Sequence, residues 1–201
     1  MAARDDETLA FYAREATTYA VRARGEHSPR LLNFLSQLRP GAKILELGCG
    51  AGQDAAVMLD QGFTVAPTDG TPGLAKHAEQ RLGIPVRVLR FDELDETDAY
   101  DAVWANACLL HVPFDALSRV LGLIHRALLP GGLFYASYKA GEGGGRDLLG
   151  RYYNFPSRDA LSGAYRTAAS WSSLQIDTGK GGGYDGVERT WLHVTARKSQ
   201  P

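Results

Sequence analysis

Three glycines at alternate positions follow a short apolar run and precede a stretch with helical spacing: Gly48, Gly50 and Gly52. The apolar run, 43–47, predicts a strand, and 53–61 predicts a helix. A strand, a glycine turn and a helix let the backbone approach a nucleotide closely. A phosphate-binding loop of the form GxxxxGK[ST] is excluded, because Gln53 and Asp54 follow the last glycine where its lysine and hydroxyl residue belong. The dinucleotide pattern GxGxxG needs a third glycine at position 53, which argues against NAD.

Carboxylates near the predicted strand ends narrow the choice of ligand. Glu46 lies at the end of a predicted buried strand, where a carboxylate is costly unless it has a partner. It would repel a pyrophosphate but attract the α-ammonium group of S-adenosylmethionine (SAM). Asp69 ends the next strand, where a carboxylate can accept both ribose hydroxyls, although a turn and helix cap is the alternative role. Asp92 ends the third strand and is placed for an adenine amino group, unless it caps a short helix.

Strand-like and helix-like segments alternate over much of the chain. Parallel strands joined by helices give a sheet that is covered on both faces, and the glycine-rich TGKGGGYDG between the last two runs predicts a hairpin. We therefore expect an α/β fold: a three-layer, doubly wound, mainly parallel seven-stranded sheet that ends in an antiparallel β-hairpin. The expected strands are 43–47, 63–68, 86–91, 101–107, 133–138, 171–177 and 189–197, and the expected helices are 6–24, 29–38, 53–61, 72–82, 114–129 and 157–168.

Four segments together resemble the class I (Rossmann-like) SAM-dependent methyltransferases: ELGCGAGQDA, VAPTDGTPGLAKHAEQRLG, RFDELDETDAYDAVWANACLLHVP and LLPGGLFYASY. The resemblance implies that the glycines approach the amino-acid part of SAM and that Glu46 orients its ammonium group. It also implies that Asp69 holds the ribose, that Asp92 approaches the adenine and that Asn106 lies near the sulfonium. The expected cofactor-binding set is Tyr12, Tyr19, Glu46, Gly48, Cys49, Gly50, Gly52, Asp69, Gly70, Asp92, Glu93, Leu94 and Asn106. The product would be S-adenosyl-L-homocysteine (SAH).

Groups that touch the methyl acceptor are expected beyond the carboxyl ends of the strands, where ligands bind in an open parallel sheet. His111 follows the fourth predicted strand and is a candidate general base; packing at a helix entry is the alternative. Arg151 and Tyr152 follow a glycine-rich segment and could bind an anionic or planar acceptor, or pack at the surface. These three residues are the catalytic candidates.

The segments around this edge are candidates for a lid over the ligands. Tyr12 and Tyr19 lie about two helical turns apart, so they could close over the cofactor or pack the core. The glycine-rich segments 141–145 and 179–183 should face the same edge if the strand 171–177 is parallel to its neighbours. They could form the lid with the N-terminal helix, or be ordinary surface loops.

The composition limits the class of protein. The chain has 201 residues, a formal net charge of −1 and no long basic block, whereas nucleic-acid binding usually needs a basic stripe. Cys49 and Cys108 lack metal-type spacing, so we expect no metal site. No run reaches about 20 apolar residues, the length of a membrane-spanning helix, and the acidic N-terminus has no signal-peptide core. We expect a cytoplasmic protein with no membrane partner.

These features predict one methyltransferase domain with three parts: an N-terminal helical cap (1–38), a SAM-binding core (39–138), and a substrate-side insertion with the terminal hairpin (139–201). We expect methyl transfer to a small molecule by in-line displacement, in a monomer or weak homodimer without a nucleic-acid partner. A tRNA or protein methyltransferase is the second hypothesis, and a non-catalytic SAM-binding regulatory module is the third. The fold itself does not choose the acceptor.

Overall fold

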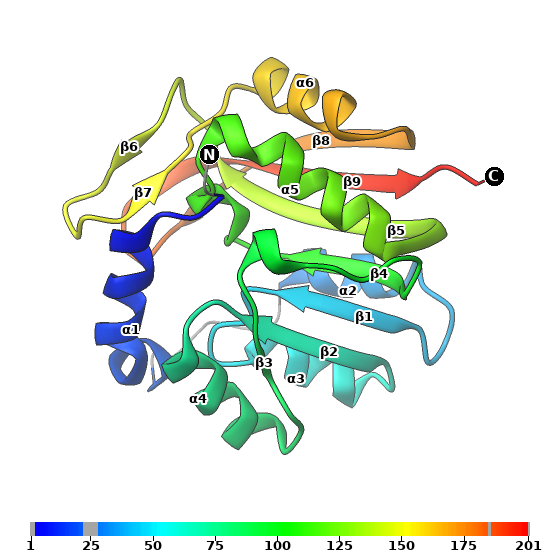
Figure 1. Ribbon diagram of the computed structural model, residues 1–201, viewed down its shortest axis with the longest axis horizontal. Helices are drawn as coiled ribbons and strands as arrows, with labels where there is room; N and C mark the ends of the chain where they lie inside the picture. Colours follow the sequence, from blue (N-terminus) through cyan, green and yellow to red (C-terminus); the bar gives the residue numbers. More distant parts are fainter. Residues whose placement is uncertain (1–2, 22–27, 185, 201) are drawn as a thin grey trace.

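A seven-stranded sheet lies at the centre of the molecule, with the strand order β3-β2-β1-β4-β5-β9-β8 (Figure 1). The structure, a computed structural model, describes residues 3–21, 28–184 and 186–200. Adjacent strands pair in parallel except at β9, which is antiparallel to both neighbours. The strands of this sheet are β1 (Lys43–Leu47), β2 (Thr64–Asp69), β3 (Arg87–Val88), β4 (Tyr100–Ala105), β5 (Leu128–Lys139), β8 (Trp171–Gly182) and β9 (Glu188–Lys198). The expected fold class is confirmed.

Helices cover both faces of the sheet because successive strand residues point to opposite sides. Ile44 packs in a cluster with α2 and α3, whereas Leu45 packs in a second cluster with α5 and α6. On β4, Trp104 packs in the same cluster as Ile44, and Val103 packs in the same cluster as Leu45. The helices are α1 (Asp6–Val21), α2 (Pro29–Leu35), α3 (Gln53–Asp60), α4 (Pro72–Leu82), α5 (Phe114–Ala127) and α6 (Arg158–Ala168). No helix in the described part of the chain is long and apolar enough to cross a membrane.

The terminal hairpin reaches the edge of the sheet where ligands are expected. Because β9 is antiparallel to both β5 and β8, β8 runs parallel to β5. The tip between β8 and β9 therefore lies at the carboxyl edge of the parallel strands, as expected from the sequence. The strands of this hairpin are longer than expected, and Gly179–Gly182 pair within the ladder.

Several elements of the structure have different ends from those expected from the sequence. The strand expected over 86–91 is only two residues long, because the chain turns at Arg90 into a 3-10 helix, η1 (Phe91–Glu93). The helix expected over 29–38 ends at Leu35, and the chain continues from there in tighter turns. The segment 141–153 contains an unexpected small hairpin, β6 (Gly145–Arg146) with β7 (Tyr152–Tyr153). The expected helix 6–24 is α1 as far as Val21, and its remainder lies outside the described residues.

The N-terminal helix α1 lies across the carboxyl edge of the sheet, between α4 and the β6–β7 hairpin (Figure 1). Arg146 on β6 forms an ion pair with Asp5, with Nη2 2.7 Å from Oδ2. The backbone N–H of Tyr152 donates to Thr8 Oγ1 at 2.8 Å. Segments that are about 140 residues apart in sequence therefore meet at the carboxyl edge of the sheet.

Leu121 on α5 is fully buried against the sheet, and its removal should leave a cavity. We predict that Leu121→Ala lowers the free energy of unfolding by about 2–5 kcal/mol, measured by urea denaturation. The control Leu148→Ala changes a fully exposed side chain and should alter stability by less than about 0.5 kcal/mol. Equal effects of the two variants would contradict the assignment of α5 to the core.

Candidate functional site

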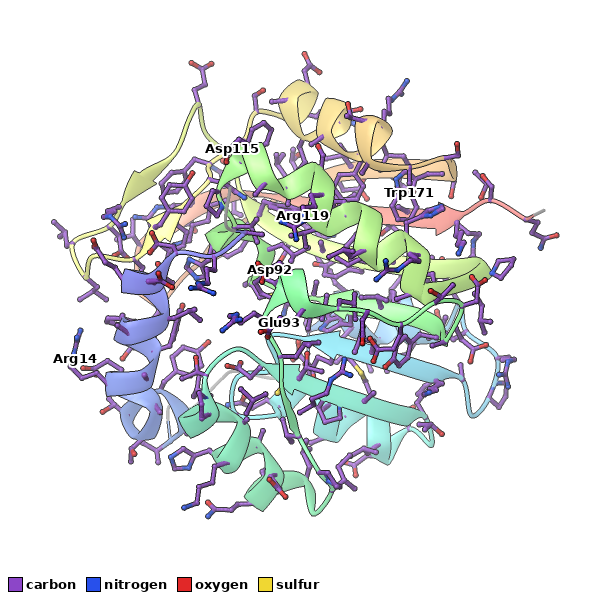
Figure 2. The ribbon with its side chains drawn as sticks, viewed as in Figure 1. Arg14, Asp92, Glu93, Asp115, Arg119 and Trp171 are labelled. Atoms are coloured by element: carbon purple, nitrogen blue, oxygen red, sulfur yellow. The ribbon has the colours of Figure 1, made fainter. Side chains whose placement is uncertain are left out.

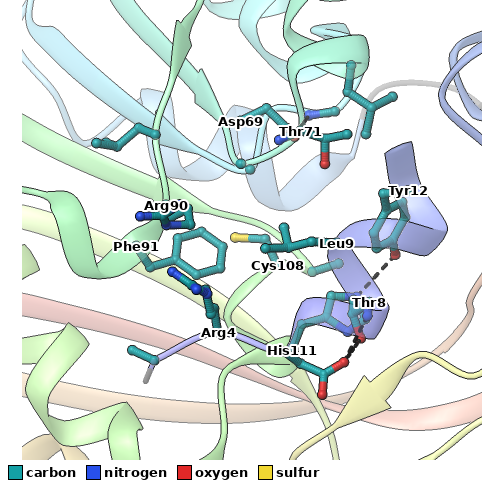
Figure 3. Close-up of a pocket in the computed structure, with 18 of the residues that line it drawn as sticks. Arg4, Thr8, Leu9, Tyr12, Asp69, Thr71, Arg90, Phe91, Cys108 and His111 are labelled. Atoms are coloured by element: carbon teal, nitrogen blue, oxygen red, sulfur yellow. Dashed lines mark hydrogen bonds between the residues drawn. The ribbon is translucent and has the colours of Figure 1, made fainter. Parts of the chain in front are cut away.

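Two neighbouring cavities open at the carboxyl edge of the sheet. The first has a volume of about 720 Å³, including the open space at its mouth, and is lined by α1, the glycine turn, the end of β2 and η1 (Figure 3). The second has about 1750 Å³, measured in the same way, and is lined by α1, the segment after β4, the end of β5 and both hairpins. They share the lining residues Tyr12, Tyr19, Gly48, Ala107 and His111. These five residues form the boundary between the cavities.

The glycine turn places backbone directly in the wall of the first cavity. Gly48 has a φ of +64°, and a Cβ there would lie 2.5 Å from Cys108 Cβ. Gly50 has a φ of +58°, and its Cβ would lie 3.2 Å from Tyr19 Cε1. A side chain at either position would strain the backbone and fill the cradle. Gly52 is the N-cap of α3, packs against α4 and lines neither cavity.

Asp69 joins this turn to the end of β2. Its Oδ2 accepts the Gly50 N–H at 2.9 Å, and its Oδ1 accepts the Thr71 N–H at 2.8 Å. Burial raises the pKa of Asp69 to about 6, and the two hydrogen bonds oppose that rise. Asp69 and the adjacent Gly70 both line the first cavity. The carboxylate thus braces the turn, and it lines the cavity in which the ribose is expected.

Glu46 and Cys49 lie behind the glycine turn. Both are buried, and neither lines the two cavities. The pKa of the Cys49 thiol is raised, first by burial and then by the nearby carboxylates of Glu46 and Asp69. The thiol is therefore protonated and unreactive at neutral pH.

The segment after β3 lines the first cavity with different residues from those expected. Arg90 and Phe91 line the first cavity, whereas Asp92, Glu93 and Leu94 do not. Figure 2 shows Asp92 and Glu93 close together at η1. Asp92 Oδ1 lies 4.0 Å from Arg90 Nε, and neither atom has a hydrogen-bond partner among the described residues. The Glu93 carboxylate accepts hydrogen bonds from Arg90, and Leu94 is buried in the core.

A chain of hydrogen bonds crosses the boundary between the cavities. His111 Nδ1 lies 2.6 Å from the Tyr152 carbonyl oxygen, which can only accept, so Nδ1 carries the proton. Nε2 is then the acceptor for the Tyr12 hydroxyl at 3.1 Å. The same hydroxyl accepts a hydrogen bond from Arg151 Nη1 at 3.1 Å. Burial, together with the charges of Arg151 and Lys139, lowers the pKa of His111 to about 4. His111 is therefore neutral at physiological pH.

The acceptor-side candidates Arg151 and Tyr152 occupy distinct places, and the expected cofactor-binding residue Asn106 does not line the first cavity. Arg151 lines the second cavity and is 1% exposed in its side chain, with Nη2 2.6 Å from Asp147 Oδ2. The side chain of Tyr152 lines neither cavity, and its backbone holds His111 and Thr8. Asn106 lines the second cavity and is held by Asp54 and Ser137.

Several lining residues were missed in the sequence. Arg90 and Phe91 directly precede Asp92, and Lys139 directly follows the predicted strand 133–138, so their positions at strand ends were a usable signal. Trp191 and His193 also line the second cavity, but they lie on β9. Their placement depends on the β5–β9 register, which no local pattern indicates.

The first cavity fits SAM by the chemistry of its lining. Gly48 and Gly50 provide a cradle that a Cβ would fill. Each oxygen of the Asp69 carboxylate accepts one backbone N–H, which leaves capacity to accept ribose hydroxyls. Phe91, Leu89 and Leu74 offer apolar surface for a base. Among the described residues no cluster of His, Cys, Asp or Glu could hold a metal ion.

Comparison with known proteins agrees with this fold, which is that of a Rossmann-like methyltransferase. The family model for the methyltransferase domain matches residues 17–174. The chain therefore belongs to this family of SAM-dependent class I methyltransferases.

Individual relatives carry different activities. The protein-L-isoaspartate O-methyltransferase of Gloeobacter violaceus is 36% identical over 44% of this chain and 42% of its own length. A ubiquinone biosynthesis O-methyltransferase of Xanthomonas campestris is 32% identical over 49% of this chain and 43% of its own length. The chain thus matches less than half of these two proteins. The crystal structure of Burkholderia thailandensis 1,6-didemethyltoxoflavin-N1-methyltransferase, with 1,6-didemethyltoxoflavin and SAH bound, is 25% identical with a TM-score of 0.73 and covers 97% of this chain and 88% of its own.

The cradle at Gly48 gives a direct test of the first cavity. We predict that Gly48→Ala weakens SAH binding at least about tenfold, because the methyl group collides with Cys108 and the positive φ is strained. Gly163→Ala, in open space on α6, should leave SAH affinity unchanged. Titration calorimetry measures both, and unaltered affinity in Gly48→Ala would remove this turn from the cofactor site.

The raised pKa of Asp69 predicts a pH-dependent affinity. As the pH falls through about 6, the carboxyl gains a proton and loses capacity to accept ribose hydroxyls, so SAH affinity should fall. Calorimetry from about pH 5 to about pH 8 should show this loss below pH 6. Asp69→Asn should bind about tenfold more weakly at neutral pH and lose this pH dependence.

Asp60→Asn serves as the control, because it alters an exposed carboxylate at the end of α3. It should reproduce the wild-type profile. An Asp69→Asn profile that still falls below pH 6 would assign the titration to another group.

Proposed function

We propose that the protein transfers a methyl group from SAM to a small-molecule acceptor, with SAM in the first cavity and the acceptor in the second. The shared boundary at Tyr12, Gly48 and His111 carries this proposal, because it lets the two ligands meet at one point. SAM, when bound, supplies a methyl group already activated on a sulfonium. The protein has to hold the acceptor in line with that methyl group and exclude water.

The cofactor-binding roles follow from the cavity lining. Gly48 and Gly50 admit the amino-acid part of SAM, and Glu46 behind the turn favours its ammonium group. Asp69 accepts the ribose hydroxyls. Phe91 and Arg90 border the adenine end, with Asp92 next to them. The helical cap 1–38 contributes Tyr12 and Tyr19 to the wall, and 139–201 contributes the acceptor side.

His111 is the proposed general base. Its Nε2 carries the lone pair and lies at the boundary, so it can take a proton from an acceptor hydroxyl directly or through Tyr12. The Tyr152 carbonyl oxygen accepts the Nδ1–H hydrogen bond both in the neutral ring and in the imidazolium that the transfer forms. Arg151, paired with Asp147, positions the Tyr12 hydroxyl and acts as a positioning residue.

A small-molecule acceptor is supported by the position of the second cavity between α1, the end of β5 and both hairpins. The bound 1,6-didemethyltoxoflavin of the Burkholderia structure, which resembles nearly the whole chain, also supports it. Transfer of label from methyl-labelled SAM to a cell extract tests the proposal. Label in small molecules supports it, label in RNA or protein supports the second hypothesis, and binding without transfer supports a regulatory module.

The base role predicts a separation of turnover from cofactor binding. We predict that His111→Gln lowers the rate of SAH formation about 100-fold, because general-base catalysis contributes about that much, and leaves SAH affinity within about twofold. His77→Gln, on α4 and outside both cavities, is the matched control and should retain both. If His111→Gln turns over at the wild-type rate on an acceptor found in the extract, the base role is wrong.

A further inference from the structure

A short 3-10 helix, η2 (Leu109–His111), carries His111 to the boundary between the two cavities. The Val112 N–H closes this turn onto the Leu109 carbonyl oxygen at 3.1 Å. A turn this short leaves most of its carbonyl groups without a partner inside the turn. Leu109, Leu110 and Val112 are all buried, so their carbonyl groups need hydrogen-bond donors from elsewhere in the protein.

Asn154, directly after β7, supplies donors to three of these carbonyl groups. Its backbone N–H donates to the Leu110 oxygen at 2.8 Å. Its side-chain Nδ2 donates to the Leu109 oxygen at 3.0 Å and to the Val112 oxygen at 3.1 Å. Because a carbonyl oxygen can only accept, the amide nitrogen of Asn154 faces the turn and the amide oxygen points away. The backbone donor and the side-chain donor of Asn154 therefore both bind the turn that carries His111.

The same residue lies at a costly point of the chain. Asn154 is 1% exposed, and its Oδ1 has no hydrogen-bond partner among the described residues. A buried oxygen without a partner is costly and uncommon in folded proteins. The next residue, Phe155, has a φ of +30°, which strains a residue other than glycine. Neither feature follows from local preference, so contacts with the rest of the site must hold the segment in place.

The segment 152–154 holds His111 at two places. The Tyr152 carbonyl oxygen accepts from the imidazole Nδ1 at 2.6 Å, and Asn154 binds the backbone of the turn that carries the imidazole. The ring of Tyr153, between these two residues, lies 4.6 Å from the His111 ring. A shift of the turn against this segment would break the Nδ1 hydrogen bond. The ring could then take either tautomer and turn its Nε2 away from the boundary.

We propose that Asn154 is a positioning residue for the general base: by binding three carbonyl groups of the turn, it keeps His111 Nδ1 on the Tyr152 oxygen and Nε2 at the boundary between the cavities. Asn154 lines neither cavity, so it acts through His111 rather than on a ligand. This inference rests on the proposed function, because it identifies what aligns the base of the same site. A displacement of about 1 Å in such a group can cost about 100-fold in rate.

The His111 ring reports on this role without any turnover. Long-range proton–nitrogen NMR spectra distinguish protonated from unprotonated ring nitrogens, and comparison with His111→Gln identifies the His111 signals. In the wild-type protein at neutral pH, Nδ1 should be protonated and Nε2 unprotonated. Asn154→Leu removes the side-chain donors at similar volume, so both nitrogens should move to the average of a tautomer mixture. Wild-type ring signals in this variant would overturn the proposal.

Leu121→Ala separates positioning from a general loss of stability. It empties a buried site on α5 and removes no hydrogen bond of the turn 109–112. It should therefore lower the free energy of unfolding and leave the His111 ring signals at their wild-type positions. The same shift of these signals in Leu121→Ala as in Asn154→Leu would contradict a specific role of Asn154.

A double-mutant cycle tests whether the effect on the rate passes through His111. On an acceptor found in the extract, Asn154→Leu should lower the rate of SAH formation about tenfold and leave SAH affinity within about twofold. In the His111→Gln background, where the base is absent, the same change should lower the rate by less than about twofold. A further tenfold loss in that background, or an unchanged rate in the single variant, would refute the positioning role.

The wild-type protein supplies the test if Asn154→Leu does not fold. The side-chain amide hydrogens of Asn154 should exchange with solvent at least about tenfold more slowly than those of Asn33, which is exposed on α2. Equal exchange rates, or a wild-type His111 protonated on Nε2 instead of Nδ1, would overturn the proposal. If His111→Gln keeps the wild-type rate, the base role in the proposed function fails, whereas the ring signals still test whether Asn154 fixes the imidazole.

Discussion

The buried carboxylate of Asp69 ties together the two turns on which the site depends. By accepting the N–H groups of Gly50 and Thr71, it fixes the glycine turn after β1 relative to the start of α4. Burial of a carboxylate is costly, and these two hydrogen bonds offset part of that cost. Gly50 in turn lies against the Tyr19 ring. The glycine turn that Asp69 fixes therefore also contacts the N-terminal helix.

Polar contacts hold that helix to a segment far away in sequence. Arg146 pairs with Asp5, the Tyr152 N–H donates to Thr8, and Arg151 donates to the Tyr12 hydroxyl. Arg151 is itself neutralised by Asp147, so its burial is compensated. Tyr12 and Tyr19 of this one helix thus line both cavities. The proton on His111 is directed by the same segment through the Tyr152 carbonyl oxygen.

Much of the fold could be predicted because its sheet is buried on both faces. The run 43–47 and the helix 72–82 were predicted with the bounds that the structure has, since apolar spacing, Pro72 and Gly83 are local signals. The length of the edge strand β3 was overestimated, because the sequence does not show where pairing with β2 stops. The β6–β7 hairpin was missed, since a glycine-rich segment carries no strand pattern and its ordering depends on α1.

The sequence by itself determined the order of strands and helices, the glycine turn and the carboxylate at the end of β2, because these follow from periodicity and from strand ends. Only the tertiary structure decided which residues line the second cavity. Lys139, Arg151 and His193 come from β5, the insertion and β9, and only the β5–β9 register and the docking of the insertion bring them together. It also decided the tautomer of His111, because the carbonyl that holds its proton belongs to Tyr152, 41 residues away. Local patterns carry no information about such contacts.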